Sequence, residues 1–312
     1  MTAQLKQIDE LYQYTATDPN LQDPDTAHLA IDGNKVLGKR AVPGLDMEIT
    51  ETADGVEAIV RVQPGIKIEK PVHLCFGVLP EEGLQKIVMD VEVGSGASIA
   101  LLAHCVFPRA VNVKHLMDAR IRLHENARYV YNERHVHSPK GGITVVPKAL
   151  IEVGPGAVFE TDFELIRGRV GLIDIDYQIT ALAHSLSEMT ARVSGQADDR
   201  IKINEQITLD GEGARGVLTS KVAVRDDAEA DIRNTITANA PYARGHVDCK
   251  EILRDRGKAA AIPIVRVNHP LAHVTHEAAI GSVDGKQLQT LMARGLSEDD
   301  AVETIVNGLL KA

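Results

Sequence analysis

The sequence has no tryptophan, and Phe, Trp and Tyr together make up only 3% of its 312 residues. A compact globule of this size usually fills its core with more aromatic area. The apolar content comes instead from Val, Ile, Leu, Ala and Gly. Small and β-branched residues suit the thin, layered interior of a solenoid, in which successive turns stack closely.

Other absences exclude several classes of protein. The three cysteines, Cys75, Cys105 and Cys249, are odd in number and widely spaced, which argues against a disulfide framework. A formal net charge of -10 disfavours nucleic acid as a partner. No apolar run is long enough to span a bilayer and no signal layout opens the chain, so we expect a cytoplasmic protein that does not bind membranes. The chain also lacks a phosphate-binding Gly-x-x-x-x-Gly-Lys-Ser/Thr loop, so we expect it to bind no nucleotide.

Short alternating apolar runs begin near Met47 and predict strands, for example over 56–62 and 87–93. They are separated by a recurring turn that ends in alanine. Ala97, Ala127 and Ala157 lie 30 residues apart, and looser copies end at Ala214 and Ala228. This repeat favours a parallel β-helix, with a β-sandwich or barrel as the alternative.

Helical periodicity is confined to the two ends of the chain. An amphipathic helix is predicted over 2–14, followed by a polar link and an irregular passage to about residue 42. Near the C-terminus, Asp284 is expected to cap a short helix that Gly295 ends, and Ser297 with Asp300 resembles a capping box. The second helix carries an apolar stripe over 301–310, which packs either on its own domain or on a partner.

One thiol, several imidazoles and a carboxylate gather between residues 249 and 277. Cys249 is followed by His269, His273 and the pair His276-Glu277. Such a mixed set suits a site that binds iron or sulfur and later releases it, since permanent sites more often show repeated Cys-x-x-Cys pairs. The alternative is a buried structural cysteine near surface histidines.

A second group lies on a predicted strand, where residues two apart share one face. Tyr131, Glu133, His135 and His137 would then line up, and His-x-His resembles part of the cupin metal pattern. The alternatives are a cupin-like metal-dependent enzyme and a polar face of the sheet. Cys105 and Lys148 are weak signals by themselves.

The C-terminal sequence resembles that of the SufB/SufD family of iron–sulfur cluster assembly scaffolds. The resemblance rests on His276-Glu277, Arg294-Gly-Leu-Ser297 and Val306-Asn-Gly308 in that order, and it extends upstream to Cys249. It covers the chain from about residue 47 to the end. The long N-terminal extension of many members is largely missing, so the chain looks like the short, archaeal-type form.

The resemblance implies a mainly β protein with a right-handed parallel β-helix at 47–275, an N-terminal helical or irregular segment at 1–46 and a C-terminal helical segment at 276–312. It implies a non-enzymatic scaffold for a transient iron–sulfur cluster, held by Cys249, His276 and Glu277 at a dimer interface. Partners would be a second copy or a paralogue, a sulfur donor, apo iron–sulfur proteins and a SufC-like ABC ATPase. That ATPase would dock on an apolar set made up of Leu291, Met292, Val302, Ile305, Val306 and Leu309.

Two further expectations come from the same resemblance. Cys105 aligns with a second SufB cysteine that receives sulfur, and a transfer path would include His135, His137 and Lys148. SufB has a glutamine and a tryptophan where this chain has His135 and His137, so the path chemistry differs here. A purely structural SufD-like subunit is the remaining alternative, although SufD-type chains usually lack the cysteine and the glutamate.

Overall fold

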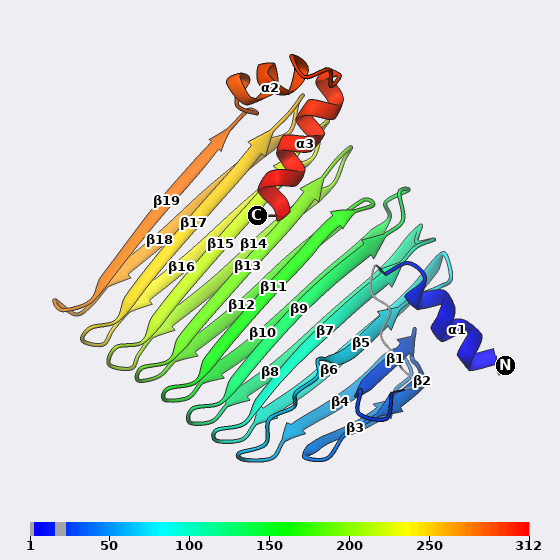
Figure 1. Cartoon of the computed structure of the whole chain (residues 1–312), viewed down its shortest axis with the longest axis vertical. Coiled ribbons are helices and arrows are strands. Elements are labelled where there is room, and N and C mark those ends of the chain that lie inside the picture. The colour runs from blue at the N-terminus through cyan, green and yellow to red at the C-terminus, as the bar shows by residue number, and fades with distance from the viewer. Residues whose placement is uncertain (1–2, 16–22, 312) are drawn as a thin grey trace.

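The chain coils into a parallel β-solenoid in which, from residue 55 on, successive strands alternate between two facing sheets (Figure 1). The computed structural model describes residues 3–15 and 23–311. Along the stack, strands within each sheet are parallel and pair with the strand one turn earlier and one turn later. This arrangement confirms the predicted β-helix rather than a sandwich, whose sheets would be antiparallel.

We name the two sheets by their outer faces. The helix-covered sheet has the order β19 (His273–Gly281), β17 (Arg244–Leu253), β15 (Arg215–Val224), β13 (Leu186–Gly195), β11 (Val158–Arg167), β9 (Arg128–His137), β7 (Ser98–Phe107), β5 (Val72–Gly77), β1 (His28–Asp32) and β2 (Lys35–Arg40). The bare sheet has the order β18 (Lys258–Val267), β16 (Glu229–Ala238), β14 (Arg200–Leu209), β12 (Leu172–Ala181), β10 (Ile143–Val153), β8 (Asn112–Leu123), β6 (Glu82–Val93), β4 (Gly55–Val62) and β3 (Leu45–Glu51).

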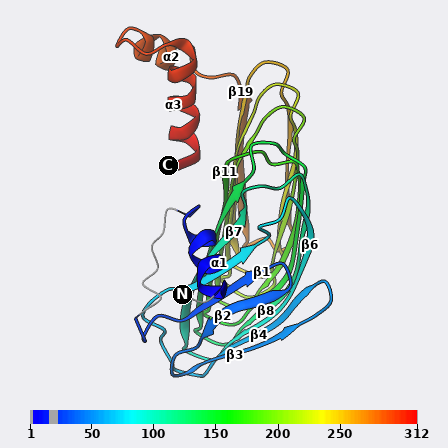
Figure 2. The ribbon, with the colours of Figure 1, turned by 90° about the vertical axis from the view of Figure 1, so that its right-hand side faces the viewer.

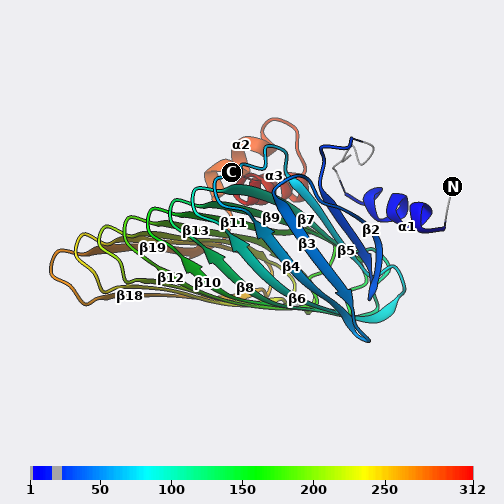
Figure 3. The same cartoon turned by 90° about the horizontal axis from the view of Figure 1, so that it is seen from below.

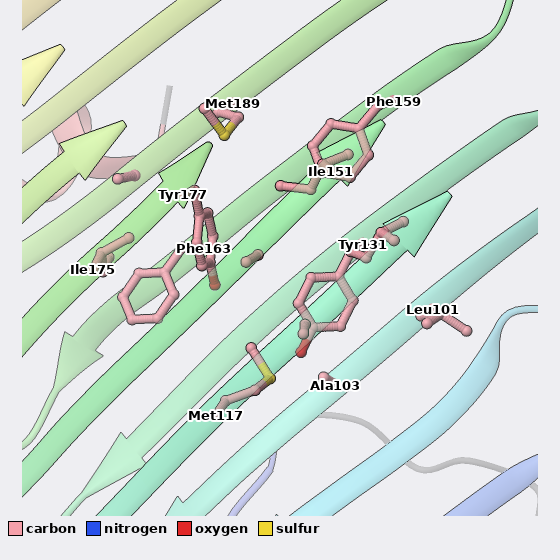
Figure 4. Packing of buried hydrophobic residues seen from close by; sticks show 14 of the residues in the cluster. Leu101, Ala103, Met117, Tyr131, Ile151, Phe159, Phe163, Ile175, Tyr177 and Met189 are labelled. Atoms are coloured by element: carbon pink, nitrogen blue, oxygen red, sulfur yellow. The ribbon is translucent and has the colours of Figure 1, made fainter. Parts of the chain in front are cut away.

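Period-two alternation places one face of every strand in a common interior. In β6, Ile87, Met89 and Val91 are buried, whereas Val88 and Asp90 between them are exposed. Figure 4 shows the aromatic members of this interior, among them Tyr131, Phe163 and Tyr177, on neighbouring strands. The interior is one contiguous layer of mostly small and branched side chains.

The alanine-ending turns form one edge of the solenoid. Ala97, Ala127 and Ala157 are buried, and the residue before each has a positive φ: Gly96 at 67°, Asn126 at 56° and Gly156 at 66°. Adjacent turns are joined by backbone hydrogen bonds, such as that from the Asn126 N–H to the carbonyl of residue 155 at 2.9 Å. The turn that ends in Ala228 differs: its positive φ is at Asp226, two residues before the alanine, and it lies on the opposite edge, between β15 and β16.

Both terminal helical regions lie on the same side of the molecule (Figure 2). α1 (Ala3–Tyr12) packs on β2 and β5, where Leu11 is fully buried. α2 (Gly285–Met292) and α3 (Glu298–Lys311) follow the last strand, and α3 packs on β15. The predicted caps are confirmed: Asp284 accepts from the Gln287 N–H at 2.7 Å, and Ser297 Oγ accepts from the Asp300 N–H at 3.2 Å.

The strands begin earlier than the sequence pattern suggested. β1 and β2 form an antiparallel hairpin within the stretch that we expected to be irregular, and β1 continues the helix-covered sheet by pairing with β5. Gly33 in its turn has a φ of 59°, and Asp32 pairs with Lys35, so the two-residue loop Gly33-Asn34 was the missed signal. At the other end, β19 runs to Gly281, past the expected boundary at 275.

The two ends of the stack differ. At the N-terminal end, antiparallel strands β2 and β3 terminate the sheets. At the C-terminal end, β18 and β19 pair with a strand on one side only, and much of their inner face is exposed (Figure 3). In the part of the chain that the structure describes, no helix is both long and apolar enough to cross a membrane.

Candidate functional site

Cys249 lies inside the solenoid, one strand from the C-terminal end of the stack, which we call the open end. It is on β17 and fully buried, with its Sγ 3.8 Å from Nδ2 of Asn234 on the facing sheet. Burial raises the pKa of the thiol, and hydrogen bonds from Ser220 and Asn234 oppose that rise. The nearby Glu251 and Asp248 carboxyls add to the rise, so the pKa of Cys249 stays above its ordinary value and the side chain is a neutral thiol in the chain alone.

The pleat separates His276 from Glu277. His276 pairs in register with buried Val247, so it lies on the inner face of β19, the face that Cys249 occupies on β17. Glu277 pairs with Asp248 and interacts with Lys250, which places it on the outer face. Within one chain, therefore, Cys249 and His276 share a face and Glu277 does not.

The other two histidines of this segment have surface positions. His269 lies in the turn before β19, where its Nδ1 accepts from the Leu271 N–H at 3.2 Å. His273 begins β19 and is exposed. Neither side chain is brought to Cys249 by the register of the strands.

A row of polar side chains runs along the interior from the middle of the stack to Cys249. Tyr177, Glu205 and Asn234 occupy one register row of the bare sheet, and we call them the interior polar row. The facing row of the helix-covered sheet contains Glu133 and Cys249, four strands apart and hence about 19 Å distant along the stack. Burying polar groups in a solenoid interior costs free energy unless they are hydrogen-bonded.

Glu205 is the buried carboxyl of that row. Burial raises the pKa of its carboxyl to about 8, and its Oε2 has no hydrogen-bond partner among the described residues. The Tyr177 hydroxyl likewise lacks a partner, and it lines an enclosed cavity of about 20 Å³ with Tyr131 and Met117. A cavity of that volume can hold about one water molecule.

The second group of predicted residues forms a buried cluster near the N-terminal end. The cluster contains Cys105 of β7, Glu133, His135 and His137 of β9, and His115 of β8. Ligand atoms of Cys105, Glu133 and His135 lie within 4.8 Å of one another. The predicted sharing of one face by Tyr131, Glu133, His135 and His137 is thus confirmed.

Hydrogen bonds join these side chains into a continuous chain. Cys105 Sγ is 3.6 Å from Glu133 Oε1 and 3.8 Å from His115 Nε2. Glu133 Oε1 is 2.7 Å from His135 Nε2, and His135 Nδ1 is 3.0 Å from His137 Nε2. At one end His137 Nδ1 donates to the Arg169 carbonyl, and at the other His115 Nδ1 meets Gln85 Oε1 at 2.9 Å.

The two ends of this chain determine where its protons lie. The Arg169 carbonyl can only accept, so the Nδ1 of His137 carries the proton and its Nε2 accepts from His135 Nδ1. A neutral His135 then accepts at Nε2, which requires a proton on Glu133 Oε1. Burial raises the pKa of Glu133 to about 7 and lowers that of His135 to about 3, in agreement with a neutral pair.

Two members of this cluster were missed from sequence. His115 is buried, and its pKa falls to about 3 because of desolvation. Gln85 is also buried, and its Nε2 donates to the carbonyls of Gly33 and Gly77 at 2.9 and 3.0 Å. The alternation of β8, with Val113 and Met117 inward on either side of His115, was the available signal.

The structure does not bring the expected transfer path together. Lys148 lies on the outer face of β10, in register with Asp118 and Asp176, and so is outside the interior. His135 and His137 lead from Glu133 toward the end of β9 and the solenoid edge, not along the stack to Cys249. Both imidazoles are also buried, so a substrate in solution does not reach them in this conformation, as a cupin-type enzyme would require.

The apolar stripe of the last helix is used largely within the chain. Val302 is buried, and with Val306 it faces Ala223 and Ile252 of the helix-covered sheet. Arg192 donates to the Leu310 carbonyl at 3.1 Å and so fixes the end of α3. Of the expected docking set, Met292 is exposed, while Leu291, Ile305, Val306 and Leu309 are half-buried.

Comparison with known proteins matches the sequence to one family. The family model described as "SUF system FeS cluster assembly, SufBD core domain" matches residues 91–309. An iron-sulfur cluster assembly SufBD family protein of Methanocaldococcus jannaschii is 36% identical over 308 residues, covering 98% of each chain. One from Pyrococcus horikoshii is 32% identical over 301 residues, covering 96% of this chain and 92% of that protein.

A further relative, from Archaeoglobus fulgidus, is 27% identical over 283 residues, covering 89% of this chain and 73% of its own. The near-complete mutual coverage with the first relatives agrees with the expected short, archaeal-type form. The chain belongs to the SufBD family of iron–sulfur cluster assembly proteins.

Proposed function

We propose that this protein is a scaffold on which a transient iron–sulfur cluster forms at the open end of the solenoid. The observation that carries the proposal is Cys249, a thiol one strand from that end, held among hydrogen-bond donors and sharing a face with His276. One thiolate and an imidazole retain iron less firmly than four thiolates do, which suits delivery to apo proteins. Glu277 lies on the other face of β19 and so cannot join Cys249 within one chain. We propose that it contributes to the site only where the open end pairs with a partner.

The open end supports pairing with a second copy or a paralogue. Val267 and Ile280 are apolar residues of the last two strands, and both are exposed. β19 also offers an unpaired backbone edge. An apolar end with a free edge is the kind of surface that stacked-repeat proteins cover with a cap or a partner. A second copy of the chain there would place two Cys249 thiols near one interface.

An ABC-type ATPase of the SufC kind is the partner that we propose for α2 and α3. The chain has no phosphate-binding loop of its own, so any nucleotide-driven step needs another subunit. Exposed Met292 and the half-buried Leu291, Ile305 and Leu309 form the apolar part of this surface. A sulfur donor and apo iron–sulfur proteins complete the set of partners.

Replacing Cys249 with serine is expected to abolish cluster formation. Wild-type protein, incubated anaerobically with ferrous iron and sulfide, should gain sulfur-to-iron charge-transfer absorption and bind iron and sulfide in equal amounts. Cys249→Ser should lose at least nine-tenths of that absorption, because serine is a poor ligand for ferrous and ferric iron in a cluster. Absorption and iron analysis measure the effect.

Cys75→Ser is the matched control, because Cys75 is equally buried but packs beneath α1. It should form the cluster as wild type does. Equal chromophore in Cys249→Ser and wild type would refute the scaffold assignment and favour a structural, SufD-like role.

Introducing a charge at the open end is expected to prevent pairing. Ile280→Asp places a carboxylate in the apolar end surface, where a partner would desolvate it, so the dimer should weaken at least a hundredfold. Val111→Asp is the control: Val111 is 43% exposed against 44% for Ile280 but lies in the turn between β7 and β8. Analytical ultracentrifugation should show monomers for Ile280→Asp alone, and identical sedimentation of the two variants would contradict the proposal.

A further inference from the structure

The buried cluster around Cys105 has three ligand atoms that lie within 4.8 Å of one another, and a fourth that lies 3.8 Å from the Cys105 sulfur. They are Cys105 Sγ, His115 Nε2, a Glu133 carboxylate oxygen and His135 Nε2. Neighbouring pairs lie 3.8, 3.6 and 2.7 Å apart. Ligand atoms around a tetrahedral divalent ion with sulfur and nitrogen ligands are about 3.3–3.5 Å apart. Small side-chain rotations would bring Cys105, Glu133 and His135 to that spacing, and the His115 ring would have to move toward Glu133 and His135 to complete it.

One carboxylate oxygen is free to complete that arrangement. Glu133 Oε1 makes both of the short contacts, whereas Glu133 Oε2 is buried and has no hydrogen-bond partner among the described residues. Rotation of the carboxyl group would bring Oε2 to a metal and relieve the 2.7 Å contact. A buried oxygen that stays without a partner is otherwise destabilising.

Both imidazoles are already oriented as metal ligands. A ligating histidine usually donates its other ring N–H to a carbonyl or carboxylate, which leaves a lone pair on the ligating nitrogen. His115 Nδ1 donates to Gln85 Oε1, and Gln85 is itself fixed by the carbonyls of Gly33 and Gly77. His135 Nδ1 donates to His137, which donates in turn to the Arg169 carbonyl. Each Nε2 therefore presents a lone pair to the space beside Cys105 and Glu133.

The charges also balance for a divalent ion. Binding displaces the proton of the Cys105 thiol and the proton of the Glu133 carboxyl, so two negative ligands meet two positive charges in a dry interior. A neutral product removes the penalty of burying either anion alone. Thiolate and imidazole ligands select transition metals such as zinc, iron(II) and cobalt(II) over magnesium and calcium, which prefer oxygen.

We propose that Cys105, His115, Glu133 and His135 form a closed, tetrahedral site for one divalent transition-metal ion in the N-terminal half of the solenoid. This site is separate from the Cys249 end and does not depend on the proposed cluster chemistry. It assigns the Cys105 thiolate to a metal and not to a carrier of sulfur. The ion would join β7, β8 and β9 and so tie the two sheets together.

Cobalt(II) is the probe, because tetrahedral thiolate ligation gives it visible d–d bands and a near-ultraviolet charge-transfer band. Protein expressed in cobalt-supplemented medium, which loads the site during folding, should carry one cobalt per chain with both signals. Cys75→Ser and Cys249→Ser should keep them unchanged. Cys105→Ser should lose the charge-transfer band, and Glu133→Gln should retain at least tenfold less cobalt.

Circular dichroism and thermal unfolding test whether each variant is folded. If Cys105→Ser does not fold, His115→Gln replaces it, since glutamine keeps a polar side chain facing Gln85 while removing the ligating nitrogen. Folded wild-type protein without thiolate-bound cobalt would overturn the proposal. A charge-transfer band that persists in Cys105→Ser, or that vanishes in Cys249→Ser, would overturn it as well and would leave the scaffold proposal standing.

Discussion

Asp199→Ala should lower the free energy of unfolding by roughly 4 kcal/mol, because it leaves several buried donors without an acceptor. The Asp199 carboxylate is fully buried in the turn between β13 and β14. It accepts from the backbone N–H groups of Val170, Gly171 and Gln196 at 2.9–3.0 Å and from Arg169 Nε at 2.9 Å. One side chain thus joins two successive turns of the solenoid edge.

Asp210→Ala provides the comparison, since Asp210 lies in an opposite-edge turn and accepts from the exposed Asn239 side chain at 2.6 Å. Its effect should stay within about 0.5 kcal/mol, as for most surface substitutions. Urea unfolding followed by circular dichroism measures both variants. Similar midpoints for the two would show that the Asp199 hydrogen bonds do not hold the edge together.

Glu205→Gln should stabilise the protein at pH 8 by roughly 4 kcal/mol and have little effect at pH 4. Burial raises the pKa of Glu205 to about 8, compared with about 4.3 for an unfolded glutamate. Between these pH values the folded protein keeps a proton that the unfolded chain has lost. Stability therefore falls as the pH rises through this range, and glutamine removes the loss.

The quantity to measure is the difference in stability between variant and wild type at each pH, because other titrating groups then cancel. Glu188→Gln, on the outer face of β13, is the control and should show a constant difference, since water reaches this carboxyl in both states. A difference for Glu205→Gln that does not grow from pH 4 to pH 8 would mean that the carboxyl is already compensated in the folded interior.

Local patterns in the sequence predicted the solenoid well, because each turn of the solenoid needs the same alternating strands and a small residue at the same corner. Ala97, Ala127 and Ala157 had to be small to fit inside the turns, and each is buried. The caps at Asp284 and Ser297 were equally local and equally correct. The β1–β2 hairpin was missed because it breaks the repeat, being antiparallel and shorter than the strands that follow.

The candidate sites were harder to predict because they depend on contacts between turns. Glu133, His135 and His137 were grouped from period two alone, yet Cys105, His115 and Gln85 join them from three other strands. The alternation of side chains along a strand could also have shown that His276 and Glu277 lie on opposite faces, since adjacent residues of a strand point in opposite directions. The interior polar row spans three strands that lie about 30 residues apart, so it is visible only once the register is known.

The unlike ends of the stack limit what the protein can assemble into. The N-terminal edge strands β2 and β3 run antiparallel to their neighbours and carry charges such as Lys39, Arg40 and Glu48, which discourage further pairing. Among the described residues, the opposite end is the one that offers an apolar surface and a free parallel strand. A head-to-tail contact would have to join these mismatched ends, which disfavours growth into a filament. The pairing of two copies that we propose at the free end would instead be isologous and would close after a single step.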